Sequence, residues 1–299
     1  MPATTNQLRL DVVIVSYHSR ELVRRCLESL RENPASAPTS VFVVDNDSND
    51  GTVEMIRRHF PDVDVDASCQ NLGFSRANNH ALRRGTSDYV LVLNPDTRLT
   101  EESLDSLLAI MERRPDVGII GPRLVREDGE FDHASRRSFP TIVGALGHFT
   151  GLGRRTERGR LAQYRAPDIH GGPVDAVNGA FMLMRRRALE NVGLFDEGFW
   201  MYMEDLDLCF RFGRAGWVTW YEPSVTVVHV KAGTSGTLRR PKLNYAFHYG
   251  MLRFYRKHYA PENRLAKNLA VYAGIVVKLG LSLVRTEARR IVRCVRSAS

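Results

Sequence analysis

The stretch DVVIVSY at residues 11–17 is apolar at almost every position, and similar runs recur along the first 120 residues. These runs, at residues 40–46, 63–67, 89–94 and 117–122, are rich in β-branched residues and are predicted to be strands. The segments between them carry the helical spacing of apolar residues. Strands that are apolar throughout and alternate with helices form a parallel sheet covered on both faces. The sequence therefore predicts an α/β fold with a mostly parallel, doubly wound sheet.

The second half of the chain is less regular. Residues 123–173 form a weakly patterned stretch with many Gly, Arg and His residues, which we expect to be a long loop or lid. Order returns at residues 177–195, where VNGAFMLMRRRALENVGLF predicts a strand followed by a short helix. EDLDLCFRFGRAG, at residues 204–216, predicts an amphipathic helix, and residues 217–230 predict two short strands.

Composition and cysteine usage favour a globular enzyme from a reducing compartment. With 299 residues and 43% hydrophobic residues, the chain can bury a large core without disulfides. The four cysteines lie at positions 26, 69, 209 and 294, with no C-x-x-C pair, which argues against both a disulfide framework and a zinc cluster. No apolar signal segment precedes the first predicted strand, so we expect a cytoplasmic protein.

The net charge of +8 is concentrated in the C-terminal part of the chain. From Lys231 onward, fifteen Lys and Arg residues face only Glu262 and Glu287, which gives this part +13 and leaves −5 for the rest. Anionic lipid, a phosphorylated acceptor and nucleic acid are the candidate partners of such a surface. The acidic cluster around Glu204 argues against nucleic acid, because a polyanion would be repelled there.

Carboxylates follow several predicted strands, and ligands of open α/β sheets bind at the carboxyl ends of the strands. Neither a G-x-G-x-x-G turn nor a phosphate-binding P-loop is present. Asp45 and Asp47 follow the second strand and could accept from a nucleobase or sugar, although an Asx turn explains them equally well. Asp96 lies in the turn NPDTRLT and could hold Mg²⁺ or Mn²⁺.

A second group of polar residues lies further along. Glu204, Asp205 and Asp207 open the predicted helix at residue 204, where acids ordinarily stabilise the helix dipole. One of them could instead serve as a general base whose pKa is tuned by its neighbour. His229 ends a predicted strand and could supply an imidazole metal ligand, or be structural.

Together these segments resemble the family 2 glycosyltransferases, which have the GT-A fold. The motifs are DVVIVSY, VVDNDSNDGT, NLGFSRANNHAL, LVLNPDTRL, VNGAFMLMRR, FWMYMEDLDLCFR and VVHVKAGTS, in the family's order over residues 10 to 260. More narrowly, the chain resembles rhamnosyltransferases that move L-rhamnose from dTDP-rhamnose to a lipid-linked N-acetylglucosamine, as in the mycobacterial cell-wall linker.

The resemblance implies an inverting, metal-dependent transfer and assigns roles to particular residues. By this likeness Asp45 contacts the nucleobase, Asp96 holds Mg²⁺ or Mn²⁺ on the diphosphate, Asp205 is the base and His229 completes the metal site. Asn94 departs from the family's D-x-D motif, so the site carries one charge fewer. The remaining expected residues are Glu204 beside the base, Ser16, Asp47, Asn71, Gly73 and Arg76 for the donor, and Asn178, Gly179 and Trp200 for the acceptor.

The resemblance also suggests the domain boundaries. We expect a glycosyltransferase domain over residues 1–240, with a nucleotide-binding half at 10–122 and an acceptor half at 174–240. A basic helical extension follows over residues 241–299. A different donor, such as UDP-galactofuranose, is an alternative. A nucleotidyltransferase is another, but it would normally show a Gly-rich N-terminal loop where this chain has SYHSRE.

The apolar stretch LAVYAGIVVKLGLSLV, at residues 269–284, is sixteen residues long and contains Lys278. A membrane span needs about 20 predominantly apolar residues. We therefore expect an amphipathic helix on the inner face of the cell membrane, with basic flanks that meet anionic headgroups and a polyprenyl diphosphate acceptor. The alternative is a helix packed on the enzyme itself or on a second subunit of a homo-oligomer.

Overall fold

The computed structural model describes residues 7–140, 170–230 and 241–298, with side chains up to residue 287. Its centre is a sheet in the order β3-β2-β1-β4-β10-β6-β11-β5, with β8 beside β11, and β7 and β9 form a separate pair. The strands are β1 (Leu10–Ser16), β2 (Thr39–Asn46), β3 (Asp64–Ser68), β4 (Tyr89–Leu93), β5 (Thr97–Arg98), β6 (Val117–Val125), β7 (Arg136–Arg137), β8 (Gly172–Pro173), β9 (Ala176–Val177), β10 (Phe181–Arg185) and β11 (Val218–His229).

The sheet is mostly parallel, as predicted. Strands β3, β2, β1 and β4 run parallel, and so do β6 and β11. Strand β10 lies antiparallel between β4 and β6. Both predicted halves of the catalytic region therefore contribute to one sheet.

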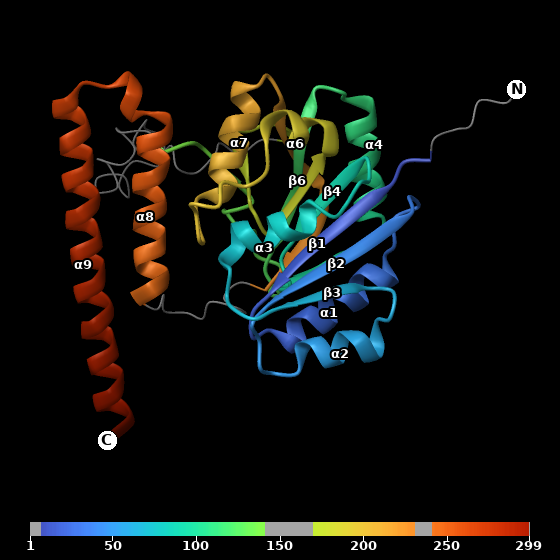
Figure 1. Cartoon of the computed structure of the whole chain (residues 1–299), viewed down its shortest axis with the longest axis horizontal. Helices are drawn as coiled ribbons and strands as arrows, with labels where there is room; N and C mark the ends of the chain where they lie inside the picture. The colour runs from blue at the N-terminus through green and yellow to red at the C-terminus, as the bar shows by residue number, and fades with distance from the viewer. Residues whose placement is uncertain (1–6, 141–169, 231–240, 299) are drawn as a thin grey trace, which may run out of the picture.

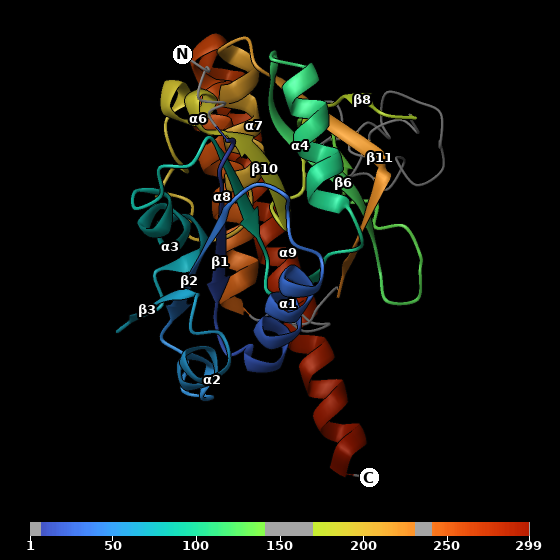
Figure 2. The same cartoon turned by 90° about the vertical axis from the view of Figure 1, so that its right-hand side faces the viewer.

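Helices cover both faces of the sheet (Figures 1 and 2). One core cluster joins the sheet to α1, α2 and α4, and the other joins it to α3, α6, α7 and α8. Successive residues Val12 and Val13 point into opposite clusters and are both fully buried, which explains why the strands are apolar throughout. The helices are α1 (Arg20–Glu32), α2 (Thr52–His59), α3 (Gly73–Leu82), α4 (Ser103–Arg113), α6 (Arg186–Val192), α7 (Glu204–Arg214), α8 (Pro241–His258), η3 (Ala260–Glu262) and α9 (Leu265–Ala298).

Two sequence-based expectations differ from the structure. The two strands predicted in residues 217–230 are one strand, β11, whose pairing with β6 is interrupted between Glu222 and Thr226. Pro223 lies in that interruption, where its missing N–H costs no ladder bond. The predicted lid is ordered over its first part, because β6 extends to Val125 and β7 follows. Residues 141–169 lie outside the described residues.

Helices α8 and α9 lie side by side beyond α7 (Figure 1). Helix α9 extends at both ends beyond the predicted apolar run of sixteen residues, and eighteen consecutive residues within Leu265–Glu287 have a mean hydropathy of 1.6. By length and composition it could cross a membrane.

Candidate active site

The donor side of the site begins where β1 and β2 end. Ser16 and Asp45 are register partners on these strands, and both are buried. One Asp45 oxygen accepts the Ser48 N–H at 2.9 Å, while the other, Oδ1, is buried with no hydrogen-bond partner among the described residues. Because an unpaired buried carboxylate oxygen is costly, Asp45 is a credible acceptor for a ligand N–H.

The NLGF segment joins this edge to the acceptor side. The side chain of Asn46 accepts from the Leu72 N–H and donates to the Gly73 carbonyl. Gly73 has φ +78°, and a Cβ there would lie 2.3 Å from the carbonyl oxygen of Trp200. Glycine is therefore required here by the close approach of the Trp200 carbonyl. Asn71 caps the turn by accepting the Gly73 N–H at 2.9 Å.

Two predicted donor residues lie at the surface. Asp47 is exposed with φ +67°, at the end of β2. Arg76 has a 61% exposed side chain, 3.8 Å from a Glu197 oxygen. Among the described residues, neither side chain forms a hydrogen bond or ion pair with Asp96 or Asp205. Their role in donor binding stays a prediction.

The proposed metal ligands are adjacent because β5 pairs with β11. This pairing sets His229 opposite Thr97, so that His229 Nε2 lies 3.5 Å from Asp96 Oδ1. Both side chains are largely buried. Asn94 is half-buried at the end of β4, and its N–H donates to the Ala180 carbonyl at 2.9 Å.

Asp132, which the sequence did not reveal, orients this histidine. Its buried Oδ2 lies 3.3 Å from His229 Nδ1, on the opposite side of the ring from Asp96. Burial opposes a charged imidazole, but hydrogen bonds to Asp132 and Asp96 raise the pKa of His229 to about 9. A metal at Nε2 would therefore have to displace the proton on that nitrogen, while the Asp132 carboxylate keeps the proton on Nδ1 and so fixes the tautomer that can bind a metal.

The predicted base, Asp205, contacts Gly179, which precedes the Ala180 that Asn94 contacts. Asp205 Oδ2 accepts the Gly179 N–H at 3.0 Å and a hydrogen bond from Arg137 Nη2, while Oδ1 accepts the Leu206 N–H at 2.8 Å. A Cβ at Gly179 would lie 3.3 Å from Asp205 Cβ. The half-buried Asn178 accepts the Ala180 N–H.

Glu204 lies beside the proposed base and has a raised pKa. Burial, together with the charge of Asp205, raises the pKa of Glu204 to about 8, so this carboxyl is mostly protonated at neutral pH. The two residues before Glu204, Tyr202 and Met203, have φ values of +71° and +73°, a conformation that is unfavourable for non-glycine residues and typical of functional sites.

Helix α8 packs against the turn that carries these residues. Lys242 Nζ lies 4.2 Å from the centre of the Trp200 ring, and Phe247 makes an edge contact with Tyr202. Further along α8, Gly250 lies so close that a Cβ would be 2.8 Å from the Tyr202 carbonyl oxygen. Trp200, predicted on the acceptor side, is thus held between the NLGF segment and α8.

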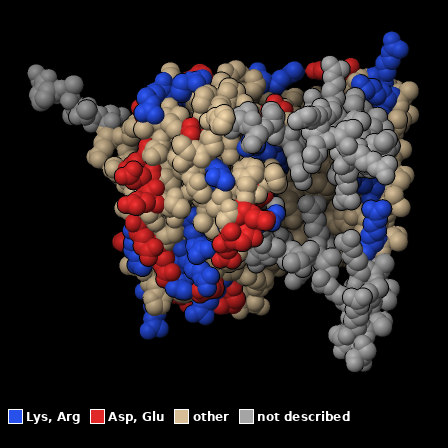
Figure 3. All heavy atoms as spheres, turned by 180° about the vertical axis from the view of Figure 1, so that it is seen from behind, with Lys and Arg blue, Asp and Glu red and all other residues tan. Residues whose placement is uncertain are grey.

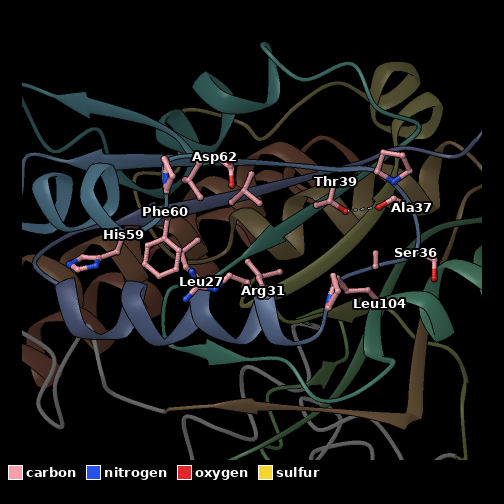
Figure 4. Close-up of a pocket in the computed structure, with 16 residues that line it drawn as sticks. Leu27, Arg31, Ser36, Ala37, Thr39, His59, Phe60, Asp62 and Leu104 are labelled. Atoms are coloured by element: carbon pink, nitrogen blue, oxygen red, sulfur yellow. Dashed lines mark hydrogen bonds between the residues drawn. The ribbon is translucent and has the colours of Figure 1, made fainter.

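A separate hydrophobic cavity of about 440 Å³ lies at the opposite end of the strands (Figure 4). Leu27, Phe60 and Leu104 line it, together with the residues that begin β2 and β3. The site residues follow the carboxyl ends of the strands, so this cavity is not part of the candidate site.

The fold is that of a GT-A glycosyltransferase. The chain belongs to glycosyl transferase family 2, whose pattern matches residues 11–193. It is 34% identical to the N-acetylglucosaminyl-diphospho-decaprenol L-rhamnosyltransferase of Mycobacterium tuberculosis over 80% of this chain and 81% of that protein. It is 28% identical to the rhamnosyltransferase WbbL of Escherichia coli over 73% of this chain and 82% of that protein.

Solved structures of other glycosyltransferases share the fold. The mannosyltransferase PcManGT from Pyrobaculum calidifontis, in complex with GDP-Man and Mn²⁺, superposes with a TM-score of 0.57 at 18% identity, over 95% of this chain and 74% of that one. GalNAc-T7 with UDP, GalNAc and Mn²⁺ gives a TM-score of 0.60 at 13% identity, over 84% and 48%.

Proposed function

We propose that this glycosyltransferase moves L-rhamnose from dTDP-L-rhamnose to N-acetylglucosaminyl-diphospho-polyprenol, with inversion at the anomeric carbon. One relationship carries the proposal. The Asn94 N–H donates to the Ala180 carbonyl, while the neighbouring Gly179 N–H donates to Asp205. The end of β4, which leads to Asp96, is thus linked to the proposed base Asp205 through the adjacent residues Gly179 and Ala180. The sugar and acceptor named here are those suggested by the relatives' activities.

The donor set fits a divalent cation. Asp96 offers a carboxylate oxygen, and His229 offers the imidazole nitrogen Nε2, which faces that oxygen. Asp132 holds the imidazole ring through its other nitrogen, Nδ1. Among the described residues no three His, Cys, Asp or Glu side chains form a metal cluster. This suits Mg²⁺ or Mn²⁺, which bind one or two protein ligands together with substrate phosphates. When bound, the cation would neutralise the charge that develops on the leaving diphosphate.

In the proposed reaction, Asp205 accepts the proton of the acceptor hydroxyl. The acceptor oxygen forms a bond to the anomeric carbon as the bond to the diphosphate oxygen breaks, and that electron pair leaves with the nucleotide. A single displacement inverts the configuration. Protonated Glu204 adds no second negative charge beside Asp205, and Asp45 offers its buried oxygen to the nucleobase.

We further propose that α9 binds the inner face of the cell membrane. Its side toward α8 carries Tyr272, Ile275 and Ser282, the last of which donates to Asn244 at 3.0 Å. Lys278 is half-buried one turn beyond Ile275, so the charge that seemed to interrupt the apolar run does not lie on the outward face. That face is apolar and exposed at Leu265, Leu269, Val276, Val277, Leu281 and Val284.

Basic residues flank the outward apolar face of α9. Arg264 and Lys267 precede it and Arg285 follows, and Figure 3 shows Lys and Arg spaced along this otherwise uncharged edge. Such a face with cationic flanks suits the anionic surface of a membrane and would bring a polyprenyl diphosphate acceptor to the enzyme.

The test is a donor and acceptor screen. The protein is incubated with dTDP-rhamnose, UDP-galactofuranose and other nucleotide sugars, with a synthetic N-acetylglucosaminyl-diphospho-prenol and Mg²⁺ or Mn²⁺. The proposal requires metal-dependent formation of a rhamnosyl product with release of dTDP. Transfer from UDP-galactofuranose, without transfer from dTDP-rhamnose, would instead assign the alternative donor.

A further inference from the structure

We propose that Arg137 is a positioning residue for this reaction, whose guanidinium fixes the direction of the Asp205 carboxylate and balances its charge. The inference rests on the proposed function, in which Asp205 removes the acceptor proton. This arginine was not predicted from the sequence, because it lies in the weakly patterned stretch expected to be a long loop or lid.

The pairing of β7 with β9 brings Arg137 to the base. Arg137 is opposite Ala176 in this pair, and its Nη2 donates both to the Val177 carbonyl at 3.1 Å and to Asp205 Oδ2. The side chains of Arg137 and Asp205 are only 14% and 10% exposed. With the Gly179 and Leu206 N–H groups also bound, the carboxylate cannot turn without losing several hydrogen bonds.

The other charged groups described near Asp205 are acidic or bound elsewhere. Glu204, Asp207 and Cys209 lie near Asp205 on α7, and Lys257 and His258 of α8 contact Asp207. Among the described residues, Arg137 is the cation in contact with Asp205. A guanidinium at hydrogen-bond distance stabilises an ionised carboxylate and makes it harder to protonate, most strongly where little water screens the pair.

The role of Arg137 in the step follows from this arrangement. The acceptor O–H bond breaks and its proton passes to Asp205, while the acceptor oxygen bonds to the anomeric carbon and the diphosphate departs with the electron pair. Arg137 keeps its own proton throughout. Removing the charge of Arg137 would make this carboxylate easier to protonate, so the acid limb of the rate profile would move to higher pH.

The test is the pH dependence of kcat/KM for the acceptor in the full-length enzyme. In Arg137→Gln we expect the acid limb of the profile to move up by about 1 to 3 pH units. The matched control is Arg136→Gln, since Arg136 stacks on Phe131 and Tyr221 from the same strand without contacting Asp205. This control should leave the pH of the acid limb of the kcat/KM profile unchanged, even where it alters the stability of the protein.

A second variant separates charge from geometry. Arg137→Lys keeps the charge, but its ammonium ends one bond short of the position of Nη2, so it should retain the acid limb and lose about tenfold or more in kcat. It also carries the test if Arg137→Gln does not fold by circular dichroism. An unmoved acid limb in Arg137→Gln, or an unchanged kcat in Arg137→Lys, would overturn the inference. Absence of transfer by the wild-type enzyme would instead contradict the proposed function.

Discussion

His258 Nε2 of α8 lies 2.7 Å from Oδ1 of Asp207 on α7, two residues beyond Asp205. Lys257 Nζ contacts the same oxygen at 2.8 Å, and Arg211 Nε donates to the other oxygen at 2.8 Å. The Asp207 side chain is fully buried. The hairpin of α8 and α9 is therefore anchored through an ion network to the helix that carries the proposed base.

Asp207→Asn should destabilise the protein, because it leaves three basic side chains around a neutral amide. Removing one partner of a buried ion network costs about 3 kcal/mol or more. The midpoint of urea unfolding at pH 7, compared between wild type and variant, measures this loss. A variant as stable as the wild type would show that the ion network around Asp207 does not hold α8 in place.

The same network predicts how stability depends on pH. Burial alone would raise the pKa of Asp207, but the hydrogen bond from His258 and the charges of Arg211 and Lys257 lower it below its ordinary value. A carboxylate with a lowered folded-state pKa stabilises the fold above its unfolded pKa of about 4, and this contribution is lost as the pH falls further. The stability difference between wild type and Asp207→Asn should narrow as the pH falls from 5 toward 3, and a constant difference would contradict the network.

Gly250→Ala should impair catalysis through the strained turn. The new methyl group would lie 2.8 Å from the Tyr202 carbonyl oxygen and 3.1 Å from Met203 Cγ, so the turn before Glu204 must shift. A displacement of about 1 Å at a catalytic group can cost about 100-fold in rate. We expect a lower kcat with nearly unchanged nucleotide affinity, measured by transfer kinetics and calorimetry. Gly213→Ala at the exposed C-terminal end of α7, where a Cβ would meet no atom within 4 Å, is the control and should remain active.

Asp132→Asn should weaken metal binding, although Asp132 is not itself one of the proposed metal ligands. Loss of a carboxylate that orients a histidine ligand costs about 10- to 100-fold in metal affinity. Calorimetric titration of Mn²⁺ in the presence of dTDP measures the effect, and Asp96→Ala provides the comparison in which a proposed ligand itself is removed. The exposed Asp128, in the same hairpin, supplies the control Asp128→Asn. Equal Mn²⁺ affinity in Asp132→Asn and wild type would show that the Asp132–His229 contact is structural only.

Glutamate on the outward face of α9 should abolish membrane binding. The double variant Val277→Glu and Leu281→Glu is compared with Thr86→Glu, a charge added at an exposed position of the body. Wild type and Thr86→Glu should float with anionic vesicles at low salt and less at high salt, whereas the double variant should not float. Binding that survives high salt and carbonate extraction would mean that the apolar stretch within Leu265–Glu287 spans the bilayer.

The sequence predicted the parts of the fold whose signal is local. The runs that became β1, β2 and β4 were recognisable because burial on both faces makes nearly every residue apolar, and their observed bounds differ by about one residue. The length of α9 was underestimated, because the apolar run was counted alone while the helix continues into the basic residues that follow.

The site could be predicted only where residues follow long, regular elements. Asp45, Asp96, Asp205 and His229 lie at strand or helix ends, and the structure sets Asp96 beside His229 as expected. Asp132 and Arg137 were missed because they reach the site through the two-residue strand β7 and a single β-bridge at Val125. Such short pairings leave no periodic pattern, and their partners are far away in the sequence.

The most direct test of the central claim is the kinetics of Asp205→Asn, measured together with its affinity for the donor. Because a base acts on the acceptor proton and not on nucleotide binding, kcat should fall by about 10²- to 10⁴-fold while the dissociation constant of dTDP in the presence of Mn²⁺ stays nearly the same. The asparagine is isosteric, so circular dichroism should show an unchanged fold. Retention of more than about a tenth of the wild-type kcat would exclude Asp205 as the base of this glycosyltransferase.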